Sequence, residues 1–390
     1  MTGDGKDPAP SPPDITTRDL LRQFWRDVYG KEVQSASTYS YTWMADQLGH
    51  ICIGILADFL ATFAVGRWMY GADATYRDGS LGGLLITVAA VSLWELSAYR
   101  SSVTQATAVF VLDKKLLRDN AIIAAVYMAL GGVVGFAFHQ IAAYAFPIAF
   151  GVLGVAIILA PRWLRQKIIW QKAGLPYLFR LADAVPTIST DGARELQKFI
   201  DAPTPPEVSA RQVIIGGPVG SGRTSLATGL GTEFAFKGHK VRYVGFASLL
   251  EFASDVTPGR YPDDSGPANI GYWPWSEAQL VVIDDIGPEM VDPLQTAPNI
   301  ERLSNLLGRS LQPIRNVLAQ RHTVWIVGDH FDFQPAGSGL NDIAKLIKEY
   351  CSSSEPTLLI ELSAASPEPP LPKGTVSVKQ VNVRRIEKAQ

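Results

Sequence analysis

The stretch Gly217-Pro-Val-Gly-Ser-Gly-Arg-Thr224 decides the fold that we predict for this chain. It directly follows the apolar run 212–215, which is typical of a buried strand, and it precedes a helical pattern. Glycines at this spacing let backbone N–H groups turn inward around phosphate oxygens, and the dipole of the following helix favours the same anion. The stretch matches the pattern GxxxxGK[ST] with Arg223 in the lysine position. It therefore predicts a phosphate-binding loop.

The loop supplies most of the residues that we predict to bind a nucleotide. The predicted set is Gly217, Pro218, Val219, Gly220, Ser221, Gly222, Arg223, Thr224 and Ser225. The Thr224 hydroxyl is the predicted ligand of Mg²⁺. Arg223 departs from the pattern, because a planar guanidinium is bulkier than the compact ammonium of lysine. We expect ATP to bind despite this change, whereas hydrolysis depends on whether Arg223 replaces lysine between the phosphates.

Four further short apolar runs predict the rest of a sheet, at 241–244, 280–283, 323–327 and 357–362. Helical stretches separate them, which indicates a five-stranded parallel α/β sheet. The third run ends in Asp284 and Asp285, so we predict that Asp284 binds Mg²⁺ and that Asp285 polarises the attacking water. The fourth run is followed by Asp329, which is the candidate sensor of the γ-phosphate.

Residues 205–362 resemble the AAA+ ATPases of the helicase-loader and transposition-helper type (IstB/DnaC-like), through the loop, the stretch 238–250 and Val281-Val-Ile-Asp-Asp-Ile-Gly287. The resemblance implies an AAA+ P-loop NTPase fold, ATP with Mg²⁺, and a homo-oligomer in which an arginine of a neighbouring subunit completes the site. The candidates for that arginine are Arg309, Arg315 and Arg321. The residues after 362 are too few for a C-terminal helical lid. Residues 252–278 depart from the family pattern with a Pro/Gly-rich loop, whose Tyr272, Trp273 and Trp275 either bind a protein partner or pack on their own domain.

The N-terminal part of the chain is unusually apolar. Hydrophobic residues make up 47% of the sequence and charged residues 18%, against about 25% charged in typical soluble domains. Four stretches approach the roughly 20 residues that cross a bilayer, and we predict transmembrane helices at about 49–68, 81–97, 121–138 and 141–160. Asp58 and Glu95 lie inside the first two, where an acid serves ion passage or helix pairing. Alternatively, Asp58 is protonated or pairs with a neighbouring helix, and Glu95 reaches the interface. Gly131 and Gly135 form a GxxxG spacing, which lets helices approach closely.

Lysine and arginine are distributed unevenly around these stretches. The loop 99–120 and the flank 162–172 carry eight, whereas the loop 67–80 and the hairpin 139–140 carry two. The positive-inside rule then places both termini in the cytoplasm and the protein in the cell (inner) membrane as a multi-pass protein.

The remaining segments complete the predicted organisation. Residues 1–48 form a cytoplasmic segment with an amphipathic helix at 16–33, which lies on the membrane or docks on the chain's own domain. Residues 163–205 form a linker with a short helix near 192–200, residues 206–363 the ATPase domain, and residues 364–390 a Pro-rich tail with a basic end.

Composition excludes several functions and leaves others open. The formal net charge of −2 and the lack of a basic-aromatic stripe do not support nucleic acid as a partner, and two cysteines are too few for a disulfide framework. The favoured interpretation is a membrane-anchored, slow ATPase that couples nucleotide state to the membrane helices or to a bound protein. The alternatives are a non-hydrolysing nucleotide sensor or scaffold, a nucleotide-gated membrane effector, and a GTPase. The GTPase is disfavoured because no Asn-Lys-x-Asp motif follows the fourth strand.

Overall fold

The computed structural model describes residues 15–22, 39–71, 79–104, 114–140, 142–181, 190–205, 209–256, 271–286, 300–328, 339–351, 357–362 and 382–386. The chain divides into two compact units, residues 18–165 and residues 166–390 together with the segment up to residue 17. We call these the helical unit and the α/β unit and describe each by itself. Of the predicted amphipathic helix 16–33, residues 17–22 are helical and residues 23–33 lie outside the described part.

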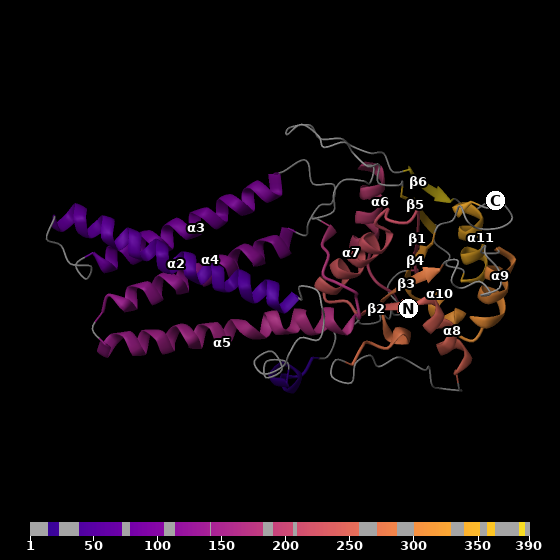
Figure 1. Ribbon diagram of the computed structural model, residues 1–390, viewed down its shortest axis with the longest axis horizontal. Coiled ribbons are helices and arrows are strands. Elements are labelled where there is room, and N and C mark those ends of the chain that lie inside the picture. Colours follow the sequence, from indigo (N-terminus) through magenta and orange to yellow (C-terminus); the bar gives the residue numbers. More distant parts are fainter. Residues whose placement is uncertain are drawn as a thin grey trace, which may run out of the picture. The chain divides into compact units, whose positions relative to one another are not determined.

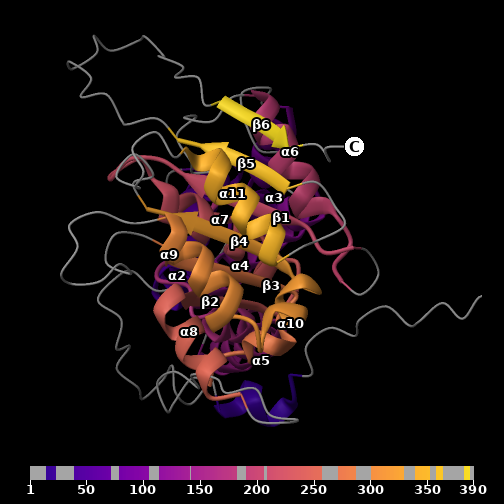
Figure 2. The same ribbon diagram turned by 90° about the vertical axis from the view of Figure 1, so that its right-hand side faces the viewer.

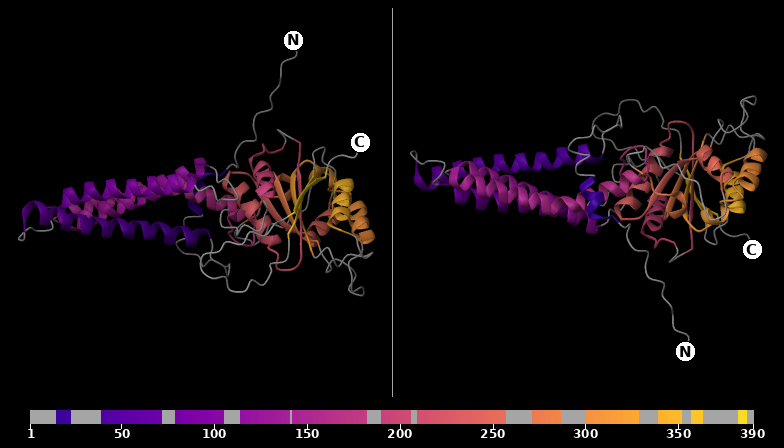
Figure 3. Two further views of the ribbon diagram at one scale, coloured as in Figure 1. Left: turned by 90° about the horizontal axis from the view of Figure 1, so that it is seen from above. Right: turned by 90° about the horizontal axis from the view of Figure 1, so that it is seen from below.

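The helical unit is built around three long helices, α2 (Tyr39–Tyr70), α3 (Ser80–Thr104) and α4 (Lys114–Phe138). Each packs against the other two, and they run side by side in Figures 1 and 3. Segments Gln47–Tyr70, Ser80–Ser101 and Arg118–Phe138 are long and apolar enough to cross a membrane. They match the first three predicted spans. Many large side chains of α2 and α3, such as Leu60, Leu85 and Trp94, are exposed rather than packed inside.

The fourth predicted span, 141–160, lies on α5 (Ala142–Lys172), a helix of 31 residues that contains Pro147 and Pro161. It is not among the three helices that meet the membrane criteria within the described residues. The last residues of α5, from Gln166 to Lys172, belong to the α/β unit. There Ile168, Ile169 and Trp170 are buried, and Gly174, with φ of +67°, follows the end of the helix.

Close backbone packing joins α2 to α4. A Cβ on Gly131 would collide with the carbonyl of Ile51, and a Cβ on Gly54 would collide with the carbonyl of Met128. Gly135, one turn beyond Gly131, lies against the carboxyl group of Asp58. Both glycines of the GxxxG spacing therefore face α2, which is the arrangement that small residues permit between membrane helices.

The α/β unit contains one sheet with helices on both faces. Its strands are β1 (Gln212–Gly216), β2 (Val241–Gly245), β3 (Leu280–Ile286), β4 (His322–Val327), β5 (Thr357–Glu361) and β6 (Asn382–Ile386). The strand order is β2-β3-β4-β1-β5-β6, as Figure 2 shows. The first five strands are parallel and confirm the predicted five-stranded parallel sheet.

The sixth strand is a correction to the predicted basic tail 364–390. Residues Asn382–Ile386, which include Arg384 and Arg385, pair antiparallel with β5, whose outer edge would otherwise carry unpaired backbone groups. The tail therefore contributes a strand, which its charge and proline content did not predict.

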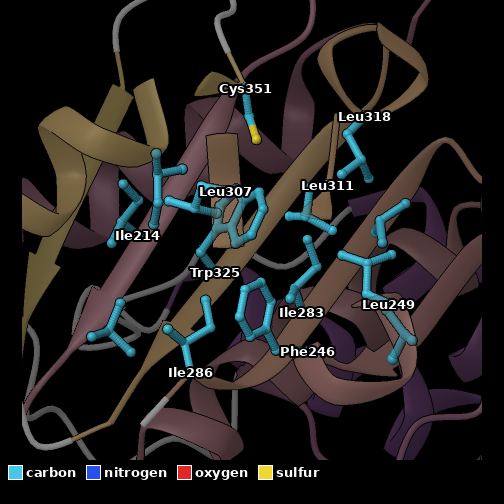
Figure 4. Packing of buried hydrophobic residues seen from close by; sticks show 14 of the residues in the cluster. Ile214, Phe246, Leu249, Ile283, Ile286, Leu307, Leu311, Leu318, Trp325 and Cys351 are labelled. Carbon is cyan, nitrogen blue, oxygen red and sulfur yellow. The ribbon is translucent and has the colours of Figure 1, made fainter. Parts of the chain in front are cut away.

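Helices cover the sheet in two layers (Figures 1 and 3). One face carries α6 (Thr190–Asp201) and α7 (Arg223–Phe236). The other carries α8 (Phe246–Ser254), α9 (Ile300–Asn305), a π-helical turn η4 (Leu306–Ser310), α10 (Arg315–Ala319) and α11 (Leu340–Tyr350). The core on this second face is formed by fully buried side chains of alternate strand positions and of these helices, including Ile214, Phe246, Ile283, Leu307 and Trp325 (Figure 4).

Candidate functional site

The glycine-rich loop follows β1 at the carboxyl edge of the parallel strands. Gly217, Gly220 and Gly222 have φ values of +154°, +79° and +86°, which L-residues with side chains rarely adopt. At Gly217 a Cβ would also come within 2.6 Å of the Leu362 carbonyl oxygen. The glycines are therefore required by the backbone itself. The Ser221 N–H closes the loop by donating to the carbonyl of Pro218 at 3.2 Å.

Helix α7 begins immediately after this loop, at Arg223. Its N-cap is Gly222, which has no side chain to cap the helix. The first N–H groups of a helix have no partner within the helix, and they carry the positive end of its dipole. The sequence thus leaves the donors of the first turn of α7 available at the carboxyl edge of the sheet, an arrangement that favours an anion.

Two predicted magnesium ligands meet beside this helix. The Thr224 Oγ1 donates to the carboxylate oxygen Oδ2 of Asp284 at 3.3 Å, although the two residues are 60 positions apart. Asp284 is buried near the end of β3, a strand whose apolar residues are all buried because the sheet is covered on both faces. The hydroxyl and the carboxylate that the sequence predicted as partners are therefore brought together.

Asp285 differs sharply from its neighbour. It is exposed on an otherwise buried strand, and within the described residues it is the one non-glycine position with a positive φ, at +65°. The pairing of β3 with β4 shifts register between Ile283 and Ile286, and the Asp285 N–H donates to Asp284 Oδ1 at 2.7 Å. This irregularity turns the Asp285 side chain out of the sheet while fixing the carboxylate of Asp284.

Arg223 binds the protein backbone. Its Nη1 donates to the carbonyl of Gly217 at 2.7 Å and to that of Val327, the last residue of β4, at 2.8 Å. The guanidinium thus ties the loop to the strand that lies between β1 and β3. Asp329, the predicted γ-phosphate sensor, and His330 lie outside the described residues.

Two tyrosines that sequence reasoning missed contact the same site. The Tyr243 hydroxyl donates to Asp284 Oδ2, and burial raises the pKa of this phenol far above its usual value. The Tyr177 hydroxyl lies 2.7 Å from Ser225 Oγ in the first turn of α7. The sequence shows that Tyr243 is a polar residue on a predicted strand. It does not show that this strand, β2, lies next to β3, which only the strand order of the sheet reveals. Tyr177 lies in the proline-containing linker, where no sequence motif indicates a contact with the loop.

The donor set fits Mg²⁺ in its chemistry. Thr224 and Asp284 present a hydroxyl and a carboxylate oxygen, which this ion prefers, and Mg²⁺ usually keeps several waters and phosphate oxygens as its remaining ligands. No group of three or more His, Cys, Asp or Glu side chains able to hold a metal occurs among the described residues. A soft or transition metal therefore has no ligand cluster in that part of the chain.

The three candidate arginines occupy different environments. The Arg321 Nη2 donates to the carbonyl of Ser276 at 2.7 Å, just before β4, at the edge of the sheet opposite to the loop. The Arg315 guanidinium lies 5.9 Å from the ring centre of Tyr350. Arg309 is exposed on η4. Of these three arginines, Arg309 is the most accessible to another molecule.

The aromatic residues of the predicted loop 252–278 pack on their own unit where the structure describes them. Trp275 is fully buried in the core, and Trp273 is buried against the end of α5 through its Nε1–H, which donates to the Ile169 carbonyl at 3.3 Å. Tyr272 lies under the Arg242 guanidinium, 4.4 Å from the ring centre. Residues 257–270 lie outside the described part.

The helical unit holds one of the predicted intramembrane acids in its interior. Asp58 is fully buried, and its Oδ2 lies 3.5 Å from the Nε2 of His139 at the end of α4. Thr62, one turn further along α2, is also fully buried. Glu95 is half-buried on α3. Asp58 therefore lies beside the residue that directly follows α4, which agrees with the helix-pairing interpretation.

A comparison of the chain with protein-family models finds no matching family, and a comparison with curated proteins finds no relative. The class of protein is therefore defined by the structure alone. It is an α/β protein with a five-stranded parallel sheet, joined in one chain to three helices long and apolar enough to cross a membrane.

Proposed function

We propose that the α/β unit is an AAA+-like P-loop ATPase domain that binds ATP with Mg²⁺ and hydrolyses it slowly at a membrane. One observation carries the proposal: the glycine loop, the uncapped start of α7 and the Thr224–Asp284 pair converge at one edge of the sheet. Each part suits a different portion of a magnesium nucleotide, and together they are the arrangement that the resemblance to AAA+ ATPases implies.

The roles of the residues follow from their chemistry. The N–H groups of Val219, Gly220 and residues 222–225 bind phosphate oxygens, because the positive φ of Gly220 and Gly222 turns the backbone around the anion. The oxygens of Thr224 and Asp284 hold Mg²⁺, which neutralises charge on the phosphates. Asp285, exposed beside Asp284, orients a water and accepts its proton.

The membrane part of the proposal rests on the helical unit and on charge. Three helices meet the length and composition of membrane spans, and the apolar stretch 141–160 of α5 is proposed as a fourth. The excess of lysine and arginine in 99–120 and 162–172 supports an orientation with both termini and the ATPase domain in the cytoplasm. The bilayer is thus the first partner, and a second copy of the chain, which supplies Arg309, is the proposed protein partner.

A second candidate is a sensor that binds ATP without hydrolysing it. The observation that favours it is the position of Arg223, whose Nη1 donates to two backbone carbonyls. An arginine held in this way stiffens the loop and does not reach between the β- and γ-phosphates. Turnover separates the two functions, because a sensor shows none above background.

The test uses the full-length protein in detergent. ATP should bind at least tenfold more tightly than GTP, which is about 1.4 kcal/mol. Thr224→Ala should weaken ATP binding in Mg²⁺ and leave binding in EDTA unchanged. Thr232→Ala is the matched control on the same helix, because its Oγ1 donates to the Thr228 carbonyl at 2.9 Å, away from the loop. Absence of ATP binding by the wild type would disprove the proposed function, and a preference for GTP would favour the GTPase.

A further inference from the structure

Tyr243 makes two hydrogen bonds to different parts of the chain, one through its backbone and one through its side chain. Its backbone N–H donates to the carbonyl of Ala173, the first residue after α5, at 2.8 Å. Its hydroxyl donates to Oδ2 of Asp284, the oxygen that also accepts the Thr224 hydroxyl. A single residue of β2 thus connects the end of α5 to the carboxylate of the candidate magnesium site.

The carboxylate of Asp284 has its orientation fixed by three donors. Tyr243 and Thr224 donate to Oδ2, and the Asp285 N–H donates to Oδ1. The Tyr243 phenol is the donor in its bond to Asp284, because a carboxylate oxygen can only accept. A hydrogen-bond donor behind a metal-binding carboxylate typically fixes its geometry, and its loss reduces metal affinity about 10–100-fold.

The end of α5 is held in the α/β unit by hydrogen bonds to Trp273. The Lys172 carbonyl accepts the Trp273 N–H at 2.8 Å, and the Ile169 carbonyl accepts the Trp273 Nε1–H. Ala173 is fully buried. Together with the Tyr243 N–H, which donates to the Ala173 carbonyl, these contacts join the end of α5 to β2 and to the segment that precedes β3.

The segment that follows α5 also packs along α7. A Cβ on Gly231 would lie 2.7 Å from the Leu175 side chain, and the Arg180 Nε donates to Glu233 Oε1 at 2.8 Å. The Tyr177 hydroxyl reaches Ser225 in the first turn. Residues 173–177 are therefore linked to both sides of the candidate site: to Asp284 through Tyr243, and directly to the start of α7 through Tyr177.

We propose that Tyr243 is a positioning residue that orients Asp284 for Mg²⁺ and conveys nucleotide occupancy to the carboxyl end of α5. This inference rests on the proposed function. It adds a route by which nucleotide binding is coupled to α5. Residues 173–177 form the second contact of that route, through Tyr177 and Ser225.

The test compares Tyr243→Phe with the wild type as full-length protein in detergent. Phenylalanine keeps the ring and removes the hydroxyl. In the wild type, Mg²⁺ should tighten ATP binding, and Mg²⁺ with ATP should slow amide hydrogen exchange in peptides covering 166–177. In Tyr243→Phe the magnesium-dependent gain in affinity should fall by about 10–100-fold, and saturating ATP should leave exchange in 166–177 unchanged. ATP affinity in EDTA should be equal for both.

Tyr350→Phe is the matched control, because its hydroxyl lies 3.0 Å from Ser304 Oγ. These two residues belong to α11 and α9, which cover the face of the sheet opposite to α7 (Figure 1). It should behave as the wild type in both measurements. If Tyr243→Phe retains both the magnesium gain and the exchange response, the inference is wrong while the proposed function stands. Faster exchange throughout β2 and α7 of the nucleotide-free variant would also overturn it, since that result assigns Tyr243 to folding alone. A wild type that binds no ATP overturns both proposals.

Discussion

At the scale of single residues, Asp285 offers the sharpest test of catalysis. It combines an exposed carboxylate with a φ of +65°. Asparagine tolerates this left-handed region as well as aspartate does, so Asp285→Asn removes the charge and keeps the backbone. We expect unchanged ATP affinity, an unchanged unfolding temperature, and turnover lower by about 10² or more. Wild-type turnover no higher than that of the variant would leave the sensor as the function.

Substitutions of Arg223, in the predicted phosphate-binding loop, also test whether the site hydrolyses ATP. Lysine has one ammonium on a flexible stem, so it exchanges the two contacts to Gly217 and Val327 for freedom to reach the phosphates. Arg223→Lys should therefore preserve or raise the turnover of an ATPase. Arg223→Met, which removes the charge, should lower both ATP affinity and turnover. A Lys variant with less turnover than the Met variant would contradict the proposed role.

His322 gives the α/β unit a predictable dependence on pH. It is fully buried, and burial lowers its pKa to about 4; its Nδ1 accepts the Arg211 N–H at 3.0 Å. Between its folded pKa and the unfolded value near 6.5, only the unfolded state binds the proton, so stability falls as the pH is lowered. From pH 7 to pH 5 we expect a loss of roughly 2 kcal/mol. Thermal unfolding should show a fall in Tm that His322→Gln makes shallower, and equal pH slopes would refute this assignment.

At the scale of elements, the contact between α2 and α4 depends on glycine. Gly131 lies against the backbone of Ile51, so Gly131→Leu must push the helices apart and should cost about 1–3 kcal/mol. Gly49→Leu is the control, because a Cβ on Gly49 meets nothing within 4 Å. The Tm of the protein in detergent should fall for Gly131→Leu and stay within error for Gly49→Leu. Equal effects would show that helix propensity, not packing, decides.

The elements differ in how well the sequence predicted them. The five parallel strands are close to their predicted positions, because a buried parallel strand is a short, nearly continuous apolar run such as 280–283. The strand at Asn382–Ile386 was missed, because its pairing is provided by the free edge of β5 and not by its own composition.

At the scale of the whole molecule, orientation in the membrane is the property to test. The charge distribution predicts Ser101 on the cytoplasmic side and Asp78 outside. The exposed Cys52 is first replaced by serine, and a single cysteine is then introduced at position 78 or 101. Labelling intact cells with an impermeant maleimide should distinguish the two positions. The cysteine at 78 should react and that at 101 should be protected. The reverse pattern would place the nucleotide site on the side of the membrane without ATP.

The sequence by itself determined the parts that depend on local pattern. Backbone conformation and hydrophobic periodicity are local properties, so neighbouring residues in the sequence are enough to predict them. This holds for the glycines at 217, 220 and 222, for the apolar run before Asp284 and for the apolar lengths of α2, α3 and α4. Apart from the Thr224–Asp284 pair, which the motifs predicted, tertiary structure alone decided which distant residues of the site meet. The order β2-β3-β4-β1 places Tyr243 on Asp284 and Arg223 on Val327, and packing of the segment after α5 places Tyr177 on Ser225. These contacts join residues up to 104 positions apart. The spacing of residues along the chain does not predict these contacts, because they depend on the strand order. The strand order in turn is set by how all the helices cover the sheet.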